Sequence, residues 1–233
     1  MPTVIVTGAT SGFGLATAKK FKENGYKVII TARNENKLKE IQKEINADYY
    51  FVQDVTGYGS WKNLLQFTKE KFGKLDVLIN NAGGGLNILP IEEHTEKTIR
   101  DIIDLNLNSV IFAANVFVPL FKEQKCGTIV NIASVCATHA WADWSVYASA
   151  KAGVLNFTKG LQTELQPYGV RATCVIPASA STGFQKAANI GATHDSLSVN
   201  DIAQTVYFVS TLPNTAICED ITVWGMSQMV QPL

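Results

Sequence analysis

The sequence contains few of the residues that form metal sites or disulfides. Its four cysteines and three histidines lie far apart, with no C-x-x-C pair and no histidine spacing that suits a metal ligand set. A metal centre is therefore not expected. The scattered cysteines indicate reduced thiols, the usual state in a cytosolic protein, so we expect a cytoplasmic location.

Excess charge and long apolar runs are missing too. Lysine plus arginine and aspartate plus glutamate are balanced at 20 each, whereas proteins that bind nucleic acids usually carry a basic excess. No apolar run approaches the roughly 18 residues of a membrane-spanning helix. The opening M-P-T-V-I-V-T-G has no signal-peptide character. We expect neither a nucleic-acid partner nor membrane association.

The sequence also lacks linkers and internal repeats, so residues 1–233 are predicted to form a single domain. Short apolar runs rich in Val, Ile and Thr alternate with amphipathic segments. This alternation predicts an α/β fold, a doubly wound Rossmann-type domain with a seven-stranded parallel sheet and helices on both faces. The expected strands are residues 3–7, 27–32, 49–52, 75–80, 128–132, 171–176 and 217–223, and the longest helical patterns cover 96–105, 109–121 and 146–165.

The first expected strand ends in a glycine-rich turn, T-G-A-T-S-G-F-G at residues 7–14. Glycine lets a backbone approach a pyrophosphate closely and adopt positive φ. The N-terminus of the next helix offers free N–H groups and a positive dipole end. A glycine-rich turn without a ligand is the plain alternative. The position at the first strand-to-helix turn of a doubly wound pattern favours nucleotide binding.

Several motifs, in order, resemble those of the short-chain dehydrogenase/reductase family over essentially the whole chain. T-G-x-x-x-G-x-G is that family's cofactor turn, N-N-A-G at 80–83 resembles its motif after the fourth strand, and D-V at 54–55 resembles its adenine-contacting dipeptide. The residues that match its catalytic tetrad are Asn106, Ser134, Tyr147 and Lys151. The cofactor-binding residues that the resemblance implies are Gly8, Thr10, Ser11, Gly12, Phe13, Gly14, Arg33, Asp54, Val55, Asn81, Ala82, Gly83, Tyr147, Lys151, Pro177 and Thr182.

The end of the second expected strand bears on the choice between NAD and NADP. An acidic residue there would bond the ribose 2′-hydroxyl of NAD, but the sequence has Ala32 followed by Arg33. A guanidinium can bind the 2′-phosphate that a carboxylate would repel. In the family that the chain resembles, this arginine goes with NADP(H). We therefore expect NADP(H) to be preferred over NAD(H), with Asn34 and the Ser11 hydroxyl as candidate helpers; a solvated surface arginine is the alternative.

Tyr147 and Lys151 are four residues apart, so on a helix they share one face. An ammonium beside the phenol favours tyrosinate and is expected to lower the tyrosine pKa from its ordinary value of ~10. The tyrosine could then give a proton to the alkoxide in carbonyl reduction and take one back in alcohol oxidation. Y-x-x-x-K is common on helices by chance, and the accompanying motifs are what favour catalysis. Ser134 lies near the end of the fifth expected strand, where such folds bind ligands, so its hydroxyl can hold the substrate oxygen beside the tyrosine. The resemblance implies that Lys151 also bonds the nicotinamide ribose and that Asn106 keeps a water in the relay.

The sequence departs from the family pattern after the sixth expected strand, where I-P-A-S-A-S-T-G-F places Ala178 where a glycine is usual. A Cβ there could block positive φ or shift the turn that lies against the nicotinamide. The candidate substrate contacts are Cys136, Trp141, Trp144 and Phe184. For the tryptophans, subunit contact or core packing is an equal alternative. His139 is interpreted as a wall or surface residue rather than a catalytic one.

Two interpretations from different classes follow. The first is an NADP(H)-dependent oxidoreductase that interconverts a ketone and a secondary alcohol by hydride transfer. The second is a non-catalytic NADP(H)-binding redox sensor or scaffold, which Ala178 favours and the intact tetrad disfavours. An epimerase or dehydratase is disfavoured because such chains usually carry an added sugar-nucleotide domain.

The resemblance also has implications for assembly and substrate. Family members commonly form tetramers through helices equivalent to the one that holds the small-residue segment 148–153, so a homotetramer or homodimer is expected. The ending I-T-V-W-G-M-S-Q-M-V-Q-P-L resembles the tail of bacterial members that oxidise 3-hydroxy acids. This tail could instead serve subunit packing.

Overall fold

Strands and helices alternate along the chain in the computed structural model, which describes residues 1–180 and 197–228. The strands are β1 (Thr3–Thr7), β2 (Lys27–Ala32), β3 (Tyr49–Val52), β4 (Val77–Asn80), β5 (Gly127–Ile132), β6 (Val170–Pro177) and β7 (Asp220–Val223). The helices are α1 (Gly12–Glu23), α2 (Glu35–Ile45), α3 (Tyr58–Phe72), α4 (Glu96–Ile103), α5 (Ser109–Gln124), α6 (Ser145–Leu165) and α8 (Val199–Ser210). Short helical turns lie at Ile91–Glu93, Val135–Ala137 and Gln166–Tyr168.

The strands form one parallel, seven-stranded sheet in the order β3-β2-β1-β4-β5-β6-β7. Strand β1 lies where the order reverses, with Ile5 paired to Ile29 on one side and to Leu78 on the other. In a doubly wound sheet, ligands bind outside the carboxyl ends of the strands at this point. The predicted fold class is therefore confirmed.

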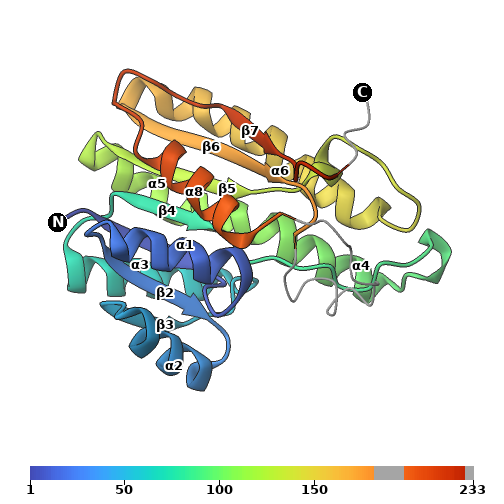
Figure 1. Cartoon of the computed structure of the whole chain (residues 1–233), viewed down its shortest axis with the longest axis horizontal. Coiled ribbons are helices and arrows are strands. Elements are labelled where there is room, and N and C mark those ends of the chain that lie inside the picture. The colour runs from blue at the N-terminus through green and yellow to red at the C-terminus, as the bar shows by residue number, and fades with distance from the viewer. Residues whose placement is uncertain (181–196, 229–233) are drawn as a thin grey trace.

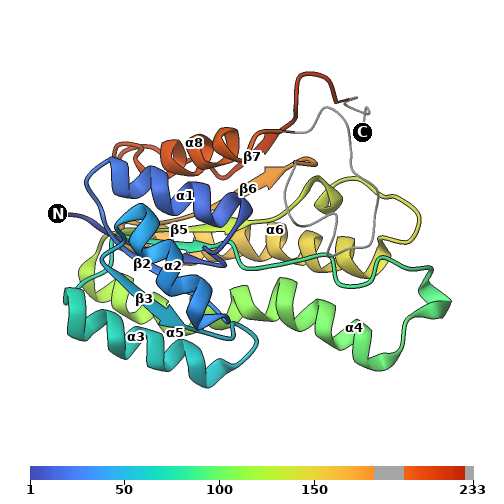
Figure 2. The same cartoon turned by 60° about the horizontal axis from the view of Figure 1, so that its bottom comes forward.

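Apolar layers bury both faces of the sheet. Val6 of β1 packs in one cluster with Phe21 of α1, whereas the adjacent Ile5 packs in another with Trp61 of α3 and Phe117 of α5. Successive strand side chains point to opposite faces, so a strand covered on both sides must be apolar throughout. Figures 1 and 2 show α1 beside α8 over one face, with α3 and α5 along the other.

Helices α4 and α5 are continuous through a π-helical turn at Asp104–Asn108. The resulting helix, Glu96–Gln124, has an 18-residue window of mean hydropathy 1.5 and could cross a membrane by length and composition alone. The sequence has no unbroken apolar run here, because polar residues such as Asp104 and Asn108 interrupt the apolar stretch. The window is 44% buried, and Phe117 and Phe121 of this helix pack in a core cluster that includes Ile129 of β5. One such helix is weak evidence of a membrane span, because buried core helices have the same composition.

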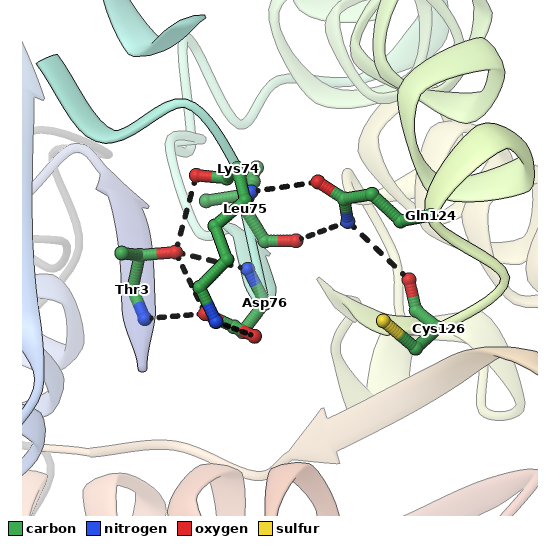
Figure 3. A network of polar contacts seen from close by, with 6 residues as sticks. All are labelled: Thr3, Lys74, Leu75, Asp76, Gln124 and Cys126. Atoms are coloured by element: carbon green, nitrogen blue, oxygen red, sulfur yellow. Dashed lines mark hydrogen bonds and ion pairs between the residues drawn. The ribbon is translucent and has the colours of Figure 1, made fainter. Parts of the chain in front are cut away.

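Polar side chains fix the amino ends of β1 and β4 (Figure 3). The Asp76 carboxylate accepts hydrogen bonds from the Thr3 backbone N–H at 2.7 Å and from the Thr3 hydroxyl at 2.9 Å. The Gln124 amide accepts from Leu75 N at 3.0 Å and donates to Leu75 O at 2.7 Å. These contacts anchor β4 and the end of α5 at the sheet edge opposite the carboxyl ends of the strands.

Candidate active site

A cleft of about 1140 Å³ lies at the carboxyl ends of the strands. The turns that follow β1 to β6 all contribute to its lining, together with residues of the Glu96–Gln124 helix, α6 and the segment after β7. This is the switch-point position that a doubly wound sheet predicts for a ligand. Every predicted tetrad residue except the buried Asn106 lines this cleft.

The glycine turn has the conformation that its sequence predicts. Gly8 and Gly12 have φ of 65° and 54°, values that favour glycine. A Cβ on Gly14 would lie 2.4 Å from Gly8 O and 2.5 Å from Asn81 Nδ2. Helix α1 begins at Gly12, and the side chain of its N-cap residue Ser11 accepts no capping hydrogen bond. The first-turn N–H groups of α1 therefore face the cleft without a side-chain acceptor, as an anion site requires.

The N-N-A-G segment braces this turn from the neighbouring strand. The Asn81 side-chain amide donates to Thr7 O at 2.8 Å and to Gly8 O at 3.3 Å. The backbone N–H groups of Asn81 and Ala82 both donate to the Thr7 hydroxyl at 3.0 Å. A Cβ on Gly83 would lie 3.0 Å from Asn106 Oδ1 and 3.3 Å from Lys151 Nζ. Glycine at this position therefore lets the N-N-A-G backbone approach two tetrad residues.

Asn106 lies in the π-helical turn and is completely buried. Its amide accepts from Gly84 N at 3.0 Å and donates to Gly84 O at 2.9 Å and to Ile102 O at 3.0 Å. A π-turn widens a helix and often marks a functional position. Here the side chain joins the helix to the segment after β4, so its position is rigidly defined.

Ser134, Tyr147 and Lys151 meet beside the end of β5. Ser134 follows that strand, and its hydroxyl oxygen accepts from Cys136 N at 3.2 Å. Tyr147 and Lys151 lie on the first two turns of α6, and only 6% and 4% of their surfaces are exposed. Lys151 Nζ is 5.7 Å from the centre of the Tyr147 ring and donates to Ile132 O at 3.0 Å. The shared helix face predicted from the sequence is present.

Burial dominates the protonation of this pair. It raises the pKa of Tyr147, and the neighbouring Cys136 thiol adds to this effect, while a hydrogen bond with Ser134 acts in the opposite direction. It also lowers the pKa of Lys151 to about 8. The expectation that Lys151 would hold the tyrosine pKa below its ordinary value was therefore wrong for this structure. Desolvation, which disfavours the charged form, is the largest cause of the shift for both groups.

The far end of the cleft is lined by Arg33, Asn34 and Asp54. The Asn34 side chain caps α2 by accepting from Lys37 N at 3.0 Å, so its oxygen is already engaged. A hydrogen bond from the backbone N–H of Thr56 lowers the pKa of Asp54, and the positive charge of Arg33 contributes to this lowering. Arg33 therefore lies on the surface beside an ionised carboxylate, at the strand end where the sequence placed it.

Ala178 does not strain the turn after β6. It is not among the described non-glycine residues with positive φ, so the expectation that a Cβ would block the required conformation was wrong. Its N–H donates to Val223 O at 2.9 Å, continuing the pairing between β6 and β7. The side chain is 6% exposed and packs in the core cluster with Ala180 and Leu197. Alanine fits here because the turn continues a strand ladder.

Three of the predicted substrate contacts lie near the tetrad. Cys136, Trp141 and Trp144 all line the cleft. Trp144 also packs edge-on against Tyr147, with ring centres 5.7 Å apart. The other predicted residues at this end, Thr182 and Phe184, lie outside the described residues.

Comparison with known families identifies the group to which this arrangement belongs. A family model described as short chain dehydrogenase matches residues 2–192. The chain is a short-chain dehydrogenase/reductase. It is accordingly an oxidoreductase that acts on CH–OH groups.

Similar proteins support this assignment over nearly the full length. The chain is 32% identical over 221 residues to "Serine 3-dehydrogenase" of Agrobacterium fabrum, covering 91% of this chain and 88% of the relative. It is 33% identical to an uncharacterized oxidoreductase of Staphylococcus saprophyticus, with 94% and 95% covered. Among solved structures, a closed form of serine dehydrogenase complexed with NADP+ superposes with a TM-score of 0.93 at 28% identity, over 99% and 98% of the two chains. Serine dehydrogenase from Escherichia coli gives a TM-score of 0.87 at 28% identity, over 98% and 100%.

The short-chain dehydrogenase has cleft residues that sequence reasoning missed. Two are on the segment after β7, Trp224 and Gln228, and two more are Leu86 and Leu105. A signal for Trp224 was available, because β7 is parallel to β6 and must end at the same sheet edge. No periodicity marks Leu86, which lies in an irregular segment after N-N-A-G.

Proposed function

We propose that the protein is an NADP(H)-dependent oxidoreductase that interconverts a ketone and a secondary alcohol. The observation that carries the proposal is the convergence of Ser134, Tyr147 and Lys151 on one end of a cleft whose other end holds Arg33. The residues fit a dinucleotide, because the turn at the N-terminus of α1 needs its three glycines: a Cβ on Gly8 or Gly14 would press on neighbouring backbone, and Gly12 has positive φ. Solved relatives described as complexes with NADP+ or NADP support the choice of cofactor.

Tyr147 is assigned the proton transfer. Because burial raises its pKa, the phenol is protonated at neutral pH and can donate to the oxygen of a carbonyl as it becomes an alkoxide. The Ser134 hydroxyl holds that oxygen beside the tyrosine. A bound nicotinamide cofactor supplies or accepts the hydride. In the reverse direction the tyrosine must first lose its proton, so alcohol oxidation should require a higher pH than ketone reduction.

Lys151 and Asn106 are assigned supporting roles. Lys151 is held at the base of the site by its bond to Ile132 O, where its ammonium can bond a ribose hydroxyl and stabilise a tyrosinate. Asn106 is held by two hydrogen bonds with Gly84, and its assigned role is to keep a water in the proton relay. Lys151 acts by position and charge and Asn106 by position alone, since hydrogen bonds hold both side chains in place.

The assignment of Tyr147 is tested with Tyr147→Phe. We expect NADPH binding, followed by fluorescence titration, to remain within about twofold of wild type, because the phenyl ring keeps its packing. Reduction of a panel of ketones, diketones, quinones and steroid ketones should fall by at least about 100-fold, since general acid catalysis contributes on this scale. Wild-type turnover in this variant would overturn the assignment.

Cofactor preference is tested with Arg33→Ala. Removing the guanidinium should weaken NADPH by about 10- to 100-fold and leave NADH almost unchanged, because a charge-assisted bond to the 2′-phosphate contributes about 1.5–3 kcal/mol. Dissociation constants for both cofactors are measured on both proteins. Equal losses for NADPH and NADH would contradict a role in phosphate recognition.

The alternative class, a non-catalytic NADP(H)-binding sensor, is separated by the same panel. Its support from the sequence was Ala178, whose backbone is unstrained. Cofactor binding without turnover of any carbonyl would favour it.

We further propose that residues 1–233 act as one domain in a cytoplasmic homo-oligomer with a small-molecule substrate. Light scattering tests the oligomeric state, and cell fractionation tests the location.

A further inference from the structure

The end of the cleft beside Tyr147 is apolar on its inner side. Leu86, Cys136 and Trp144 pack in one cluster with Tyr147 and Ile102, and the first three of these residues line the cleft. A substrate carbonyl held at Tyr147 must therefore place its substituents against aliphatic, thiol and indole surface. Such a chamber favours apolar substituents.

The outer side of the same end is aromatic. Trp141 and Trp224 line the cleft, and His139 lies between them. Its ring stacks on Trp141 with centres 5.9 Å apart and an interplanar angle of 21°, and meets Trp224 edge-on at 5.5 Å. The two tryptophans come from segments over 80 residues apart in the chain, and His139 couples them into one wall.

The segment after β7 holds Trp224 in place. The Gln228 side chain accepts from Gly225 N at 2.7 Å and donates to Ser179 O at 2.7 Å. The Gln228 backbone N–H closes the turn by donating to Gly225 O at 2.9 Å. On the other side, Val223 O accepts from Ala178 N. Trp224 is therefore fixed from both directions, as a wall that selects a substrate must be.

Apart from His139, the described residues of the wall include no basic side chain that could pair with an anionic substrate. Among the described residues that line the cleft, the basic side chains are Arg33 and Lys151. Arg33 is at the opposite end, after β2, and Lys151 is buried and bonded to Ile132 O. A carboxylate at this wall would meet indole and imidazole N–H groups instead of a guanidinium or an ammonium, so the loss of its hydration would be only partly offset.

We propose that the physiological substrate is an uncharged ketone or secondary alcohol with an aromatic or alicyclic substituent, and that Trp141 and Trp224 determine this specificity. The inference rests on the proposed function and gives it a substrate class. It differs from the chemistry of serine, named in the relatives, which carries both a carboxylate and an ammonium. Gln228 is then a positioning residue that acts through Trp224.

Matched substrates separate the contributions of charge and ring. Methyl benzoylformate, benzoylformate, methyl pyruvate and pyruvate are reduced with NADPH, and kcat and KM are determined for each. We expect each ester to exceed its free acid in kcat/KM by at least about 100-fold. The aromatic ester should exceed the aliphatic one by about tenfold or more, mainly through KM.

Variants test the wall itself. Trp224→Leu should raise KM for methyl benzoylformate by about tenfold and leave methyl pyruvate within about twofold, whereas Trp224→Phe should restore much of the aromatic preference. Gln228→Leu should shift KM in the same direction with an unchanged kcat. Tyr168→Leu is the control, because this aromatic residue is 42% exposed and lies beyond the far end of α6. Circular dichroism verifies that each variant is folded.

Equilibrium binding separates failure of the inference from failure of the proposed function. Methyl mandelate and mandelate are titrated into the protein with saturating NADPH. Tight binding of the ester without turnover of any ketone would refute the proposed function and support the substrate class. Equal binding of ester and acid, or equal turnover of esters and acids, would overturn the inference. Tighter binding of the cation 2-amino-1-phenylethanone than of acetophenone would also overturn it, by showing that the rings bind a charge.

Discussion

Replacing Lys151 with methionine should stabilise the protein and abolish its activity. Burial lowers the pKa of this lysine from 10.5 to about 8, and each pKa unit corresponds to about 1.4 kcal/mol. The buried charge therefore costs roughly 3 kcal/mol at pH 7. Methionine has a similar length and no charge, but it leaves Ile132 O without the bond it now accepts, a loss of about 1–3 kcal/mol. The expected net gain at pH 7 is about 1 kcal/mol.

The sign of the pH dependence distinguishes this cause from ordinary packing. The unfolded lysine keeps its proton up to about 10.5 and the folded lysine only to about 8. The unfolded state thus binds more protons between these values, and wild-type stability rises with pH across that window. The variant lacks this term, so its advantage at pH 7 should shrink by about 2 kcal/mol at about pH 9.5. Urea unfolding at both pH values, with unchanged m-values, measures the difference.

Lys159 provides a matched control on the same helix. Its hydrogen bond with Asp220, at 2.9 Å, raises its pKa instead of lowering it. Lys159→Met should therefore not stabilise the protein at pH 7, and it should show no advantage over wild type that shrinks as the pH is raised. If Lys151→Met were destabilised equally at both pH values, the desolvation account of this site would be refuted.

Two further predictions concern close packing and a loop anchor. Gly14→Ala should destabilise the protein by about 1–3 kcal/mol, because the new Cβ would lie 2.4 Å from Gly8 O. It should also weaken NADPH binding at least tenfold in fluorescence titrations. Gly160→Ala is the control: its Cβ would have nothing within 4 Å, so it should be neutral or stabilising. Arg171→Ala should lower the free energy of unfolding by about 2–4 kcal/mol in urea, since the guanidinium donates to Leu212 O at 2.6 Å and to other carbonyls of that loop. A loss below about 0.5 kcal/mol would show that residues 212–216 keep their position without the Arg171 hydrogen bonds.

The fold could be predicted from the sequence because its strands are apolar on both faces. A continuous run such as residues 3–7 is compatible with a buried central strand, and alternation with helices then requires parallel pairing. The strand ends were less accurate. The apolar pattern predicts a strand from residue 75, but β4 begins at Val77, because Leu75 pairs with the Gln124 side chain instead of with another strand. Such capping by a residue 49 positions away has no local signal.

The sequence predicts those site residues that lie close together in the chain, and it does not predict those that tertiary contacts bring to the cleft. Tyr147 and Lys151 share a helix face by their spacing alone. The tertiary contributions of Trp224 and Gln228 were not predicted, because they reach the cleft only once β7 is placed at the sheet edge. The pKa direction of Tyr147 was wrong for the same reason. Sequence spacing gives the distance to a neighbouring charge, whereas the depth of burial, which outweighs it here, depends on the whole fold.

The buried tetrad residues and the more exposed aromatic wall both limit the access of water to the site. Burial away from water raises the pKa of Tyr147 and lowers that of Lys151, so it lowers the stability of the folded protein. The same exclusion of water would strengthen any interaction with charge that develops on the substrate oxygen. A charged substrate would need a partner or water in this chamber and would weaken that effect. A neutral substrate with a ring against Trp141 and Trp224 would complete the exclusion of water. If Tyr147 is the proton donor, as proposed, its burial does not depend on a substrate ring. Opening the wall should therefore weaken the binding of ring substrates through KM and leave proton transfer to small neutral ketones largely unchanged.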